Sequence, residues 1–327
     1  MKISVIIPAY NAAATIQATL HAVLSQSVSP HEILVFDDGS TDDTAILLEA
    51  YKPQVTVFRQ SNQGAAHARN FLCQQAQGDV LAFLDADDLW HPRYLEVQQQ
   101  LIEKHPEAVA YFTEHENLIG YGTYPWSTEL DWQAFNSEVI EPQSFIRRYD
   151  QTPLSFQMSC FCIRSKSLTP LGNELFRVSG AEDTYLHNTL PLLGAVVHAP
   201  VRLVAYRINE ASLSSNRLRV SLLVVDVFDL LNELYISKAN PTLYKQFKAV
   251  HASRRRNCGK FLMGAGRKLE ARKQFLLAAR TSPEPASMMK SIGLYCSTLF
   301  PPSLQPQWPA GQRVFNEGNL KPGGNRA

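Results

Sequence analysis

Strand and helix patterns alternate through the first hundred residues of this chain of 327 residues. Short β-branched runs are separated by longer stretches in which apolar residues recur at helical spacing. The predicted strands are Ile3–Pro8, Glu32–Phe36, Val55–Arg59 and Val80–Leu84, and the predicted helices are Ala13–Ser25, Asp42–Tyr51 and Gly64–Gln77. Because strands joined by helical crossovers run parallel, the pattern predicts an α/β fold with a mostly parallel sheet flanked by helices.

Clusters of polar residues follow three of the predicted strands. They are Pro8-Ala9-Tyr10-Asn11, Asp37-Asp38-Gly39-Ser40 and Asp85-Ala86-Asp87-Asp88. In sheets of this kind, ligands bind beyond the carboxyl ends of the strands. The three clusters therefore predict one binding site at that edge of the sheet.

The cluster after the fourth strand contains three carboxylates within four residues. Like charges so close together repel one another, and each carboxylate resists losing its hydration. A divalent cation would relieve this repulsion, because Mg²⁺ and Mn²⁺ prefer hard oxygen ligands. The alternative is a helix that begins near His91, with Asp87 or Asp88 as its N-terminal capping residue.

The bulk composition favours a cytoplasmic globular protein of one large domain or two. Five scattered cysteines without a C-x-x-C pair favour reduced thiols. No apolar run approaches the ~20 residues that a membrane-spanning helix needs. The best candidate, from Ser221 to Leu231, is interrupted by Asp226 and Asp229.

Charge is divided unequally along the chain, although the formal net charge is only +1. Residues 1–237 contain 15 Lys and Arg against 27 Asp and Glu, a net charge of −12. Residues 238–327 contain 16 against 3, a net charge of +13. An acidic body followed by a basic part predicts two different kinds of partner.

Basic and apolar residues alternate at helical spacing in the basic part, which includes Arg254-Arg255-Arg256, and Gly264-Ala265-Gly266 is expected to divide two helices. Residues 251–290 are therefore predicted to form basic amphipathic helices. An anionic membrane surface fits them better than nucleic acid, which nothing else in the chain supports. The alternative is a solvated helix face. We expect a cytoplasmic protein that can bind peripherally at the inner face of the membrane.

Five motifs resemble, in the same order, those of family-2 glycosyltransferases of the GT-A fold. They are Ser4–Asn11, Val35–Asp42, Asn62-Gln63-Gly64 with Ala68-Arg69-Asn70, Asp85-Ala86-Asp87, and Gly180-Ala181-Glu182-Asp183. The resemblance covers about residues 1–215. It implies inverting transfer of a sugar from a nucleotide-diphosphate donor, expected to be a UDP-sugar, to a hydroxyl of a saccharide or lipid-linked acceptor in cell-surface polysaccharide or glycolipid synthesis. Residues 216–300 would be a helical extension, basic from about 245, and residues 301–327 a disordered tail.

The resemblance also implies which residues bind the donor. Asp38 would accept a hydrogen bond from the N3–H of the donor base, and Pro8 and Tyr10 would line that base. Arg69 would reach the nucleotide or its diphosphate, because a guanidinium matches the geometry of phosphate oxygens. The alternatives are ordinary turn residues for the first three and a solvated helix arginine for Arg69.

A metal and a base are implied as well. Asp87 would hold Mg²⁺ or Mn²⁺ between the two phosphates, with Asp85 turned to the ribose or to the metal. Asp183 would be the base that takes the proton of the acceptor hydroxyl, or else an acidic residue that stabilises a helix N-terminus. Asp88 is expected to cap a helix rather than bind metal, and His187 to lie on a helix surface.

Two further segments are open to more than one interpretation. Val204–Asn209, followed by Ser212 and Ser214, resembles a late family segment that often has histidine where Asn209 stands. Asparagine is a poor metal ligand, so the segment implies weaker metal binding or a role in packing alone. Aromatic residues gather between 107 and 160, where most are expected in the core or in loops and a few could stack on a sugar. They are Tyr111, Phe112, Tyr121, Tyr124, Trp126, Trp132 and Phe135.

Three other classes of protein fit the motifs less well. A dinucleotide dehydrogenase would have G-x-G-x-x-G after its first strand, which is missing here. A sugar nucleotidyltransferase would have a glycine-rich basic loop where Pro8–Asn11 stands. A non-catalytic nucleotide-sugar-binding or scaffold protein of the same fold would predict the loss of Asp85, Asp87 or Asp183, and all three are present.

Overall fold

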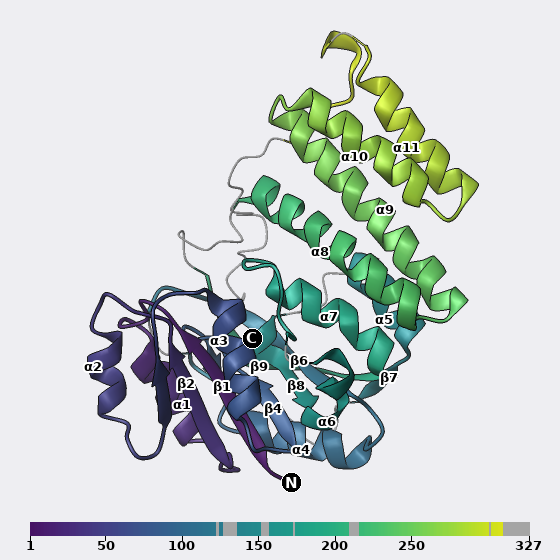
Figure 1. Cartoon of the computed structure of the whole chain (residues 1–327). Helices are drawn as coiled ribbons and strands as arrows, with labels where there is room; N and C mark the ends of the chain where they lie inside the picture. The colour runs from purple at the N-terminus through teal and green to yellow at the C-terminus, as the bar shows by residue number, and fades with distance from the viewer. Residues whose placement is uncertain are drawn as a thin grey trace, which may run out of the picture. The chain divides into compact units, whose positions relative to one another are not determined.

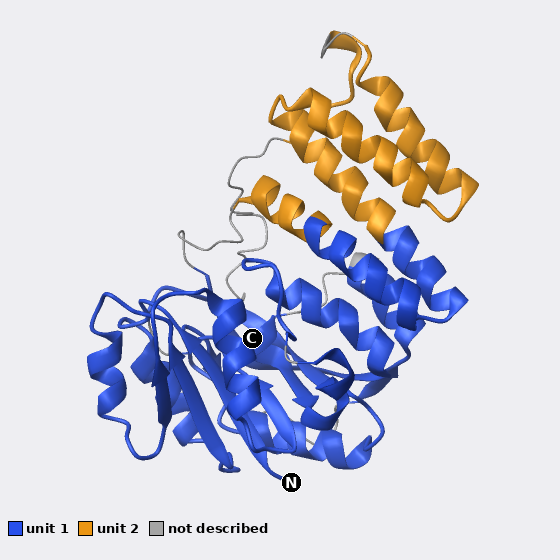
Figure 2. Ribbon diagram, viewed as in Figure 1, with its two compact units in different colours: residues 1–209, 226–250 blue, residues 210–225, 251–327 orange. Residues whose placement is uncertain are grey.

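The computed structural model describes residues 1–121, 124–126, 136–151, 157–172, 174–208, 216–300 and 302–309. The chain divides into two compact units (Figure 2). The first unit contains residues 1–209 and 226–250, and the second contains residues 210–225 and 251–327.

The first unit is built on one sheet, which has nine strands among the described residues (Figure 1). Its first four strands pair in parallel in the order β3-β2-β1-β4. They are β1 (Ile3–Ala9), β2 (Glu32–Asp37), β3 (Thr56–Arg59) and β4 (Val80–Phe83), and the helices between them are α1 (Ile16–Leu24), α2 (Thr44–Glu49) and α3 (Ala65–Gln75). The alternation of strands and helices predicted for this part is confirmed, with boundaries that differ by a few residues.

The remaining strands make the sheet mixed. Strand β8 runs antiparallel to β4 and β6, β6 and β9 are parallel, and β5 and β7 are antiparallel to β9. These strands are β5 (Leu89–Trp90), β6 (Ala110–Ile119), β7 (Glu138–Ile140), β8 (Phe161–Arg164) and β9 (Val196–Ile208). The accompanying helices are α4 (Tyr94–Lys104), α5 (Pro142–Gln151), α6 (Ser165–Leu168) and α7 (Glu182–Leu193), with 3₁₀ turns at Met158–Cys160 and Thr169–Leu171. A sheet flanked by helices confirms the predicted fold class.

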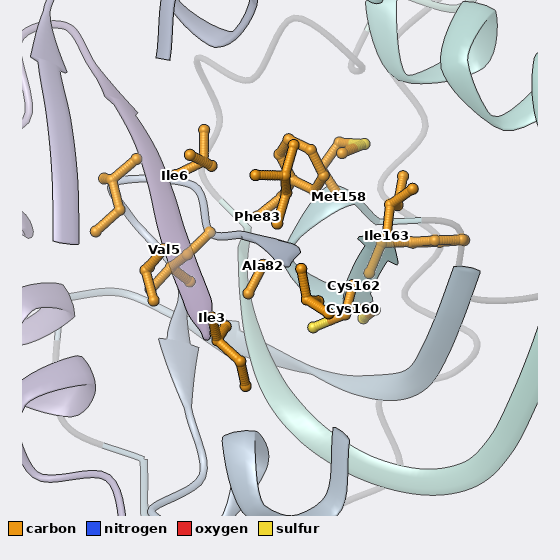
Figure 3. Close-up of a cluster of buried hydrophobic side chains, with 14 of the residues drawn as sticks. Ile3, Val5, Ile6, Ala82, Phe83, Met158, Cys160, Cys162 and Ile163 are labelled. Carbon is orange, nitrogen blue, oxygen red and sulfur yellow. The ribbon is translucent and has the colours of Figure 1, made fainter. Parts of the chain in front are cut away.

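The core lies on the central strands, which are apolar on both faces. Val5 and Ile6 of β1 and Ala82 of β4 are each 0% exposed, as expected of parallel strands covered on both sides. Figure 3 shows these side chains with Cys160 and Cys162, whose thiols are buried in the same cluster. Burial raises the pKa of the Cys162 thiol to about 12, so it packs as a small neutral side chain.

Four helices follow the sheet and contribute to both units. They are α8 (Arg217–Lys238), α9 (Pro241–Gly264), α10 (Lys268–Thr281) and α11 (Pro285–Ser297). In the first unit, Tyr235 stacks on Phe247 with ring centroids 4.0 Å apart. In the second unit, Gly259 faces the ring of Phe275, where a Cβ would lie 2.4 Å from a ring carbon. The break predicted between two helices is confirmed, because Gly266 has φ +76° between α9 and α10.

Within the described residues, no helix is both long and apolar enough to cross a membrane. The tail predicted to be disordered, residues 301–327, lies outside the described residues except for 302–309.

Candidate functional site

The loops that follow β1 and β2 are joined by hydrogen bonds. The parallel register places Ala9 opposite Asp37, at the carboxyl ends of both strands. The backbone N–H of Asp38 donates to the carbonyl of Ala9 at 2.8 Å, and the N–H of Asn11 donates to Ser40 Oγ at 2.9 Å. The first two polar clusters therefore lie side by side, as predicted.

Asp38 links the end of β2 to the start of α3. Its Oδ1 accepts the N–H of Gln63 at 2.8 Å, and its Oδ2 accepts the N–H of Gly64 at 2.7 Å. Gly64 has φ +92° and precedes the helix, so its conformation favours glycine. The Asp38 side chain is almost fully buried, with lone pairs left for a further donor. Nearby, Pro8 is half-buried and Tyr10 is exposed.

Arg69 of α3 bridges two carboxylates. The residue is 5% exposed, its Nη1 donates to Glu182 Oε1 at 2.8 Å, and its Nη2 donates to Asp85 Oδ1. Burial alone would lower the pKa of Arg69, but Asp85 and then Glu182 raise it above the usual value. The alternative of a solvated helix arginine is therefore wrong. Because Arg69 binds both groups, the loop after β4 is connected directly to the N-terminus of α7.

Asp183 lies in the first turn of α7, beside this ion pair. Its Oδ1 accepts the N–H of Thr184 at 2.6 Å. Burial, followed by the charge of Glu182, raises the pKa of Asp183 to about 6. Sequence reasoning placed Glu182 with Asp183 as acidic residues at a helix N-terminus and did not pair it with Arg69. In the structure Glu182 binds Arg69, and its Oε2 also accepts the N–H of Gly180 at 2.6 Å.

Asp85 and Asp87 follow β4 at the same edge of the sheet. Burial and then the charge of Asp85 raise the pKa of Asp87 to about 6. No set of three or more His, Cys, Asp or Glu side chains able to hold a metal occurs in the part of the chain that the structure describes. The two aspartates are hard oxygen donors, and Mg²⁺ and Mn²⁺ commonly complete such incomplete sites with phosphate and water oxygens. The residues present therefore fit a cation that arrives with a diphosphate.

Asp88 does not cap a helix, and that prediction is wrong. Helix α4 begins only at Tyr94, because β5 intervenes and pairs with β9. The Asp88 side chain is buried, where its Oδ2 accepts the hydroxyl of Ser159 at 2.5 Å and its Oδ1 accepts the N–H of Arg207 at 2.9 Å. Sequence reasoning missed Ser159 entirely and noted Arg207 only as part of a family segment.

His187 is buried, so the prediction of a surface histidine is also wrong. Its ring stacks on Phe161 with centroids 4.3 Å apart, and burial lowers its pKa to about 3. Every residue of α7 from Thr184 to Pro191 is buried. One contact covering this helix comes from α8, where Tyr235 donates its hydroxyl to the carbonyl of Asn188 at 2.8 Å.

The aromatic segment is divided between core and surface. Tyr111 and Phe112 are fully buried, whereas Tyr121 is exposed. Tyr124 and Trp126 line a cavity of about 430 Å³ together with charged side chains of β6 and β9. Stacking on a sugar stays a prediction for this pair. Trp132, Phe135, Asn209, Ser212 and Ser214 lie outside the described residues.

Comparison with known proteins identifies relatives of the N-terminal part. The family described as Glycosyl transferase family 2 matches residues 4–170. The putative teichuronic acid biosynthesis glycosyltransferase TuaG of Bacillus subtilis (strain 168) is 40% identical over 125 residues, which are 37% of this chain and 49% of that protein. WfgD of Escherichia coli, named UDP-Glc:alpha-D-GlcNAc-diphosphoundecaprenol beta-1,3-glucosyltransferase, is 39% identical over 104 residues, which are 31% of this chain and 41% of that protein. The matches thus span about half or less of these relatives.

Solved structures resemble almost the whole chain. S. aureus TarS 1–349 in complex with UDP-GlcNAc matches with a TM-score of 0.66 and 19% identity, over 91% of this chain and 90% of that one. Mannosyltransferase PcManGT from Pyrobaculum calidifontis, in complex with GDP-Man and Mn²⁺, matches with a TM-score of 0.54 and 18% identity, over 92% and 81%. These likenesses show the fold. The family match covers more than half of the chain, which therefore belongs to glycosyl transferase family 2.

Proposed function

We propose that the protein is an inverting glycosyltransferase that moves a sugar from a UDP-sugar to a hydroxyl of a saccharide or lipid-linked acceptor, in cell-surface polysaccharide or glycolipid synthesis. Residues 1–215 would form the transferase domain and residues 216–300 a helical extension. The observation that carries the proposal is the bridge made by Arg69, which holds Asp85 and Glu182 together and so keeps Asp183 beside the loop after β4. The donor and acceptor named for WfgD support the substrate classes.

The donor nucleotide would bind across the loops after β1 and β2. Asp38 would accept the N3–H of uracil through a lone pair that its two backbone contacts leave available. Pro8 and Tyr10 would line the base, and Arg69 would lie at the diphosphate. The hydrogen bonds between the two loops would keep this surface in place before the donor arrives.

Asp87, together with Asp85, would hold Mg²⁺ or Mn²⁺. When bound, the cation would neutralise the charge that develops on the leaving diphosphate. The Mn²⁺ in the PcManGT complex supports this choice of cofactor. Burial and then the charge of Asp85 raise the pKa of Asp87, and a bound cation would stabilise the ionised form of both carboxylates.

Asp183 would act as the general base. Above pH ~6 its carboxylate could accept the acceptor's hydroxyl proton. The acceptor oxygen would then form a bond to the anomeric carbon from the face opposite the leaving group. The bond from that carbon to the phosphate oxygen would break, and its electron pair would leave on UDP. The anomeric configuration would be inverted.

A panel of nucleotide sugars tests the proposal. In the presence of Mn²⁺, we expect UDP release from a UDP-sugar and little release from GDP- or CMP-sugars, with faster release when a saccharide or lipid-linked acceptor is added. An axial donor sugar should give an equatorial product by NMR. Binding of UDP-sugar without release would favour the non-catalytic alternative. Formation of UDP-sugar from UTP and a sugar 1-phosphate would favour the nucleotidyltransferase.

A second proposal concerns the second unit, which we propose binds an anionic membrane surface. One side of α11 and the residues after it is apolar and exposed: Met289 is 60% exposed, Ile292 36%, Leu299 57% and Phe300 52%. On the opposite side of α11, Ser291 is buried and Leu294 is half-buried. Helix α10 packs against α11, and exposed basic residues lie on both helices: Lys290 on α11, and Lys273 and Arg280 on α10. Exposed apolar side chains and cations on two packed helices are the features that bind an anionic lipid surface.

The sequence predicted that the basic cluster at 254–256 lies on the membrane-binding face. In the structure, Arg255 and Arg256 form hydrogen bonds within the second unit instead. Arg255 is 6% exposed, its Nη1 donates to Gln274 at 2.9 Å, and its Nε donates to His251 at 3.1 Å. Arg256 Nη1 donates to Ser287 Oγ at 3.0 Å. These arginines join helices of the second unit, so charge reversal there would damage the fold as well as remove charge.

Vesicle co-sedimentation tests the membrane proposal. The protein should sediment with vesicles containing anionic lipid, and binding should weaken as salt shortens the Debye length from ~30 Å at 0.01 M to ~3 Å at 1 M. Met289→Ser with Ile292→Ser, and separately Lys273→Glu with Arg280→Glu, should each reduce binding. Ile46→Ser is the matched control, because Ile46 is 71% exposed on α2 of the first unit. Equal sedimentation with neutral vesicles, or none with either kind, would contradict the proposal.

A further inference from the structure

A buried serine, Ser159, contacts both ends of the stretch from Asp85 to Asp88. Ser159 Oγ accepts the backbone N–H of Asp85 at 3.0 Å and donates its hydroxyl to Asp88 Oδ2 at 2.5 Å. Both Ser159 and Asp88 are 0% exposed. The hydroxyl therefore joins the two ends of a four-residue acidic stretch, and its proton and a lone pair are both used in doing so.

Arg207 also forms hydrogen bonds to this acidic stretch. Its backbone N–H donates to Asp88 Oδ1 at 2.9 Å, and its Nε donates to the carbonyl of Asp87 at 2.7 Å. Its Nη1 donates to the carbonyl of Gly120, and the residue is 3% exposed. One carboxylate oxygen of Asp88 thus accepts a hydrogen bond from Ser159 and the other accepts one from Arg207. We therefore expect Asp88 to bind these residues and not a metal.

We infer that Ser159, Asp88 and Arg207 are positioning residues that fix the relative orientation of Asp85 and Asp87 for a metal-bound diphosphate. Asp85 and Asp87 carry like charges that repel each other, and the hydrogen bonds to the backbone of Asp85 and Asp87 limit how far the two residues can move apart. Binding geometry of this kind must be held to roughly 0.5 Å by surrounding hydrogen bonds. The inference rests on the proposed function, and it assigns to three buried polar residues a role that their sequence patterns did not indicate.

A buried serine of strand β1 provides a matched control for Ser159, which lies in the 3₁₀ turn Met158–Cys160. Ser4 Oγ accepts the N–H of Gly78 at 2.8 Å and donates to Glu32 Oε1 at 2.5 Å. It is 0% exposed, like Ser159, and lies near the amino end of β1, whereas the acidic loop follows the carboxyl end of β4. Ser4→Ala and Ser159→Ala therefore remove the same two kinds of hydrogen bond, one far from the site and one within it.

The test is the affinity of the full chain for UDP, measured by calorimetry in Mn²⁺ and in EDTA, beside thermal unfolding. Mn²⁺ should strengthen UDP binding to the wild-type protein. In Ser159→Ala, the factor by which Mn²⁺ strengthens UDP binding should be at least ~10-fold smaller than in the wild-type protein. The UDP affinity of this variant in EDTA should change by less than about two-fold, because only the contacts that depend on the metal are misplaced. Ser4→Ala should keep the gain, and the melting temperatures of both variants show whether the loss follows stability alone. Asp88→Asn, which keeps the size of the side chain, should resemble Ser159→Ala and serves where that variant does not fold.

Two outcomes would overturn the inference. Ser159→Ala or Asp88→Asn could keep the Mn²⁺-dependent gain within two-fold of the wild-type value, or Ser4→Ala could lose as much of it as they do. A wild-type protein without any gain would instead contradict the proposed metal-dependent function, and the inference with it. The wild-type measurement separates the two failures.

Discussion

Asp183→Asn is expected to lower turnover by at least ~10²-fold while leaving the affinity for UDP nearly unchanged. Asparagine keeps the size of the side chain and can still accept the N–H of Thr184, so the first turn of α7 should survive. It cannot take the proton of an acceptor hydroxyl. Turnover and UDP affinity should be measured together with the melting temperature. Near-normal transfer by this variant would mean that Asp183 only stabilises the helix N-terminus.

The pH dependence gives an independent check on the same residue. The pKa of Asp183 is raised to about 6, so its carboxyl group is protonated below that pH and ionised above it. A base must be ionised, and kcat/KM of the wild-type protein should therefore fall as the pH is lowered through about 6 and level off above it. At saturating Mn²⁺, where the bound cation would keep Asp87 ionised, the residual activity of Asp183→Asn should lack this acidic limb. An unchanged limb in the variant would assign the titration to another group.

Asp87→Ala is expected to abolish metal-dependent donor binding, with a loss of UDP-sugar affinity in Mn²⁺ of at least ~10²-fold, because the cation loses a charged oxygen ligand. EDTA should lower the UDP-sugar affinity of the wild-type protein by a similar factor, and added Mn²⁺ should restore that affinity. Binding of UDP without metal should be similar in both proteins, since Asp38 and the loops after β1 and β2 are untouched.

Asp79→Ala is the control, because Asp79 accepts the N–H of Lys2 at 2.8 Å at the start of β4, away from the acidic loop. It should keep metal-dependent binding. Full transfer activity of the wild-type protein in chelator would contradict the assignment of Asp87 as a metal ligand.

Much of the fold could be predicted from local patterns. The strands and helices from Ile3 to Phe83 follow from apolar periodicity, because each pattern is complete within a few residues. The convergence of Asp38 and Asp85 at one edge of the sheet also follows, since parallel strands place their carboxyl ends together. The antiparallel strands β5 and β8 did not follow, because they are short and pair with strands far away in the chain.

The sequence by itself determined the fold class and the edge of the sheet at which the acidic residues gather, and its motifs resembled those of the family that the comparison identified. Only the tertiary structure decided which polar residues are buried. Asp88 accepts its hydrogen bonds from residues 71 and 119 positions away, and His187 and Arg255 are covered by other elements. Periodicity reports which face of an element is apolar, but a polar residue buried by a distant partner has the same local pattern as one exposed to water.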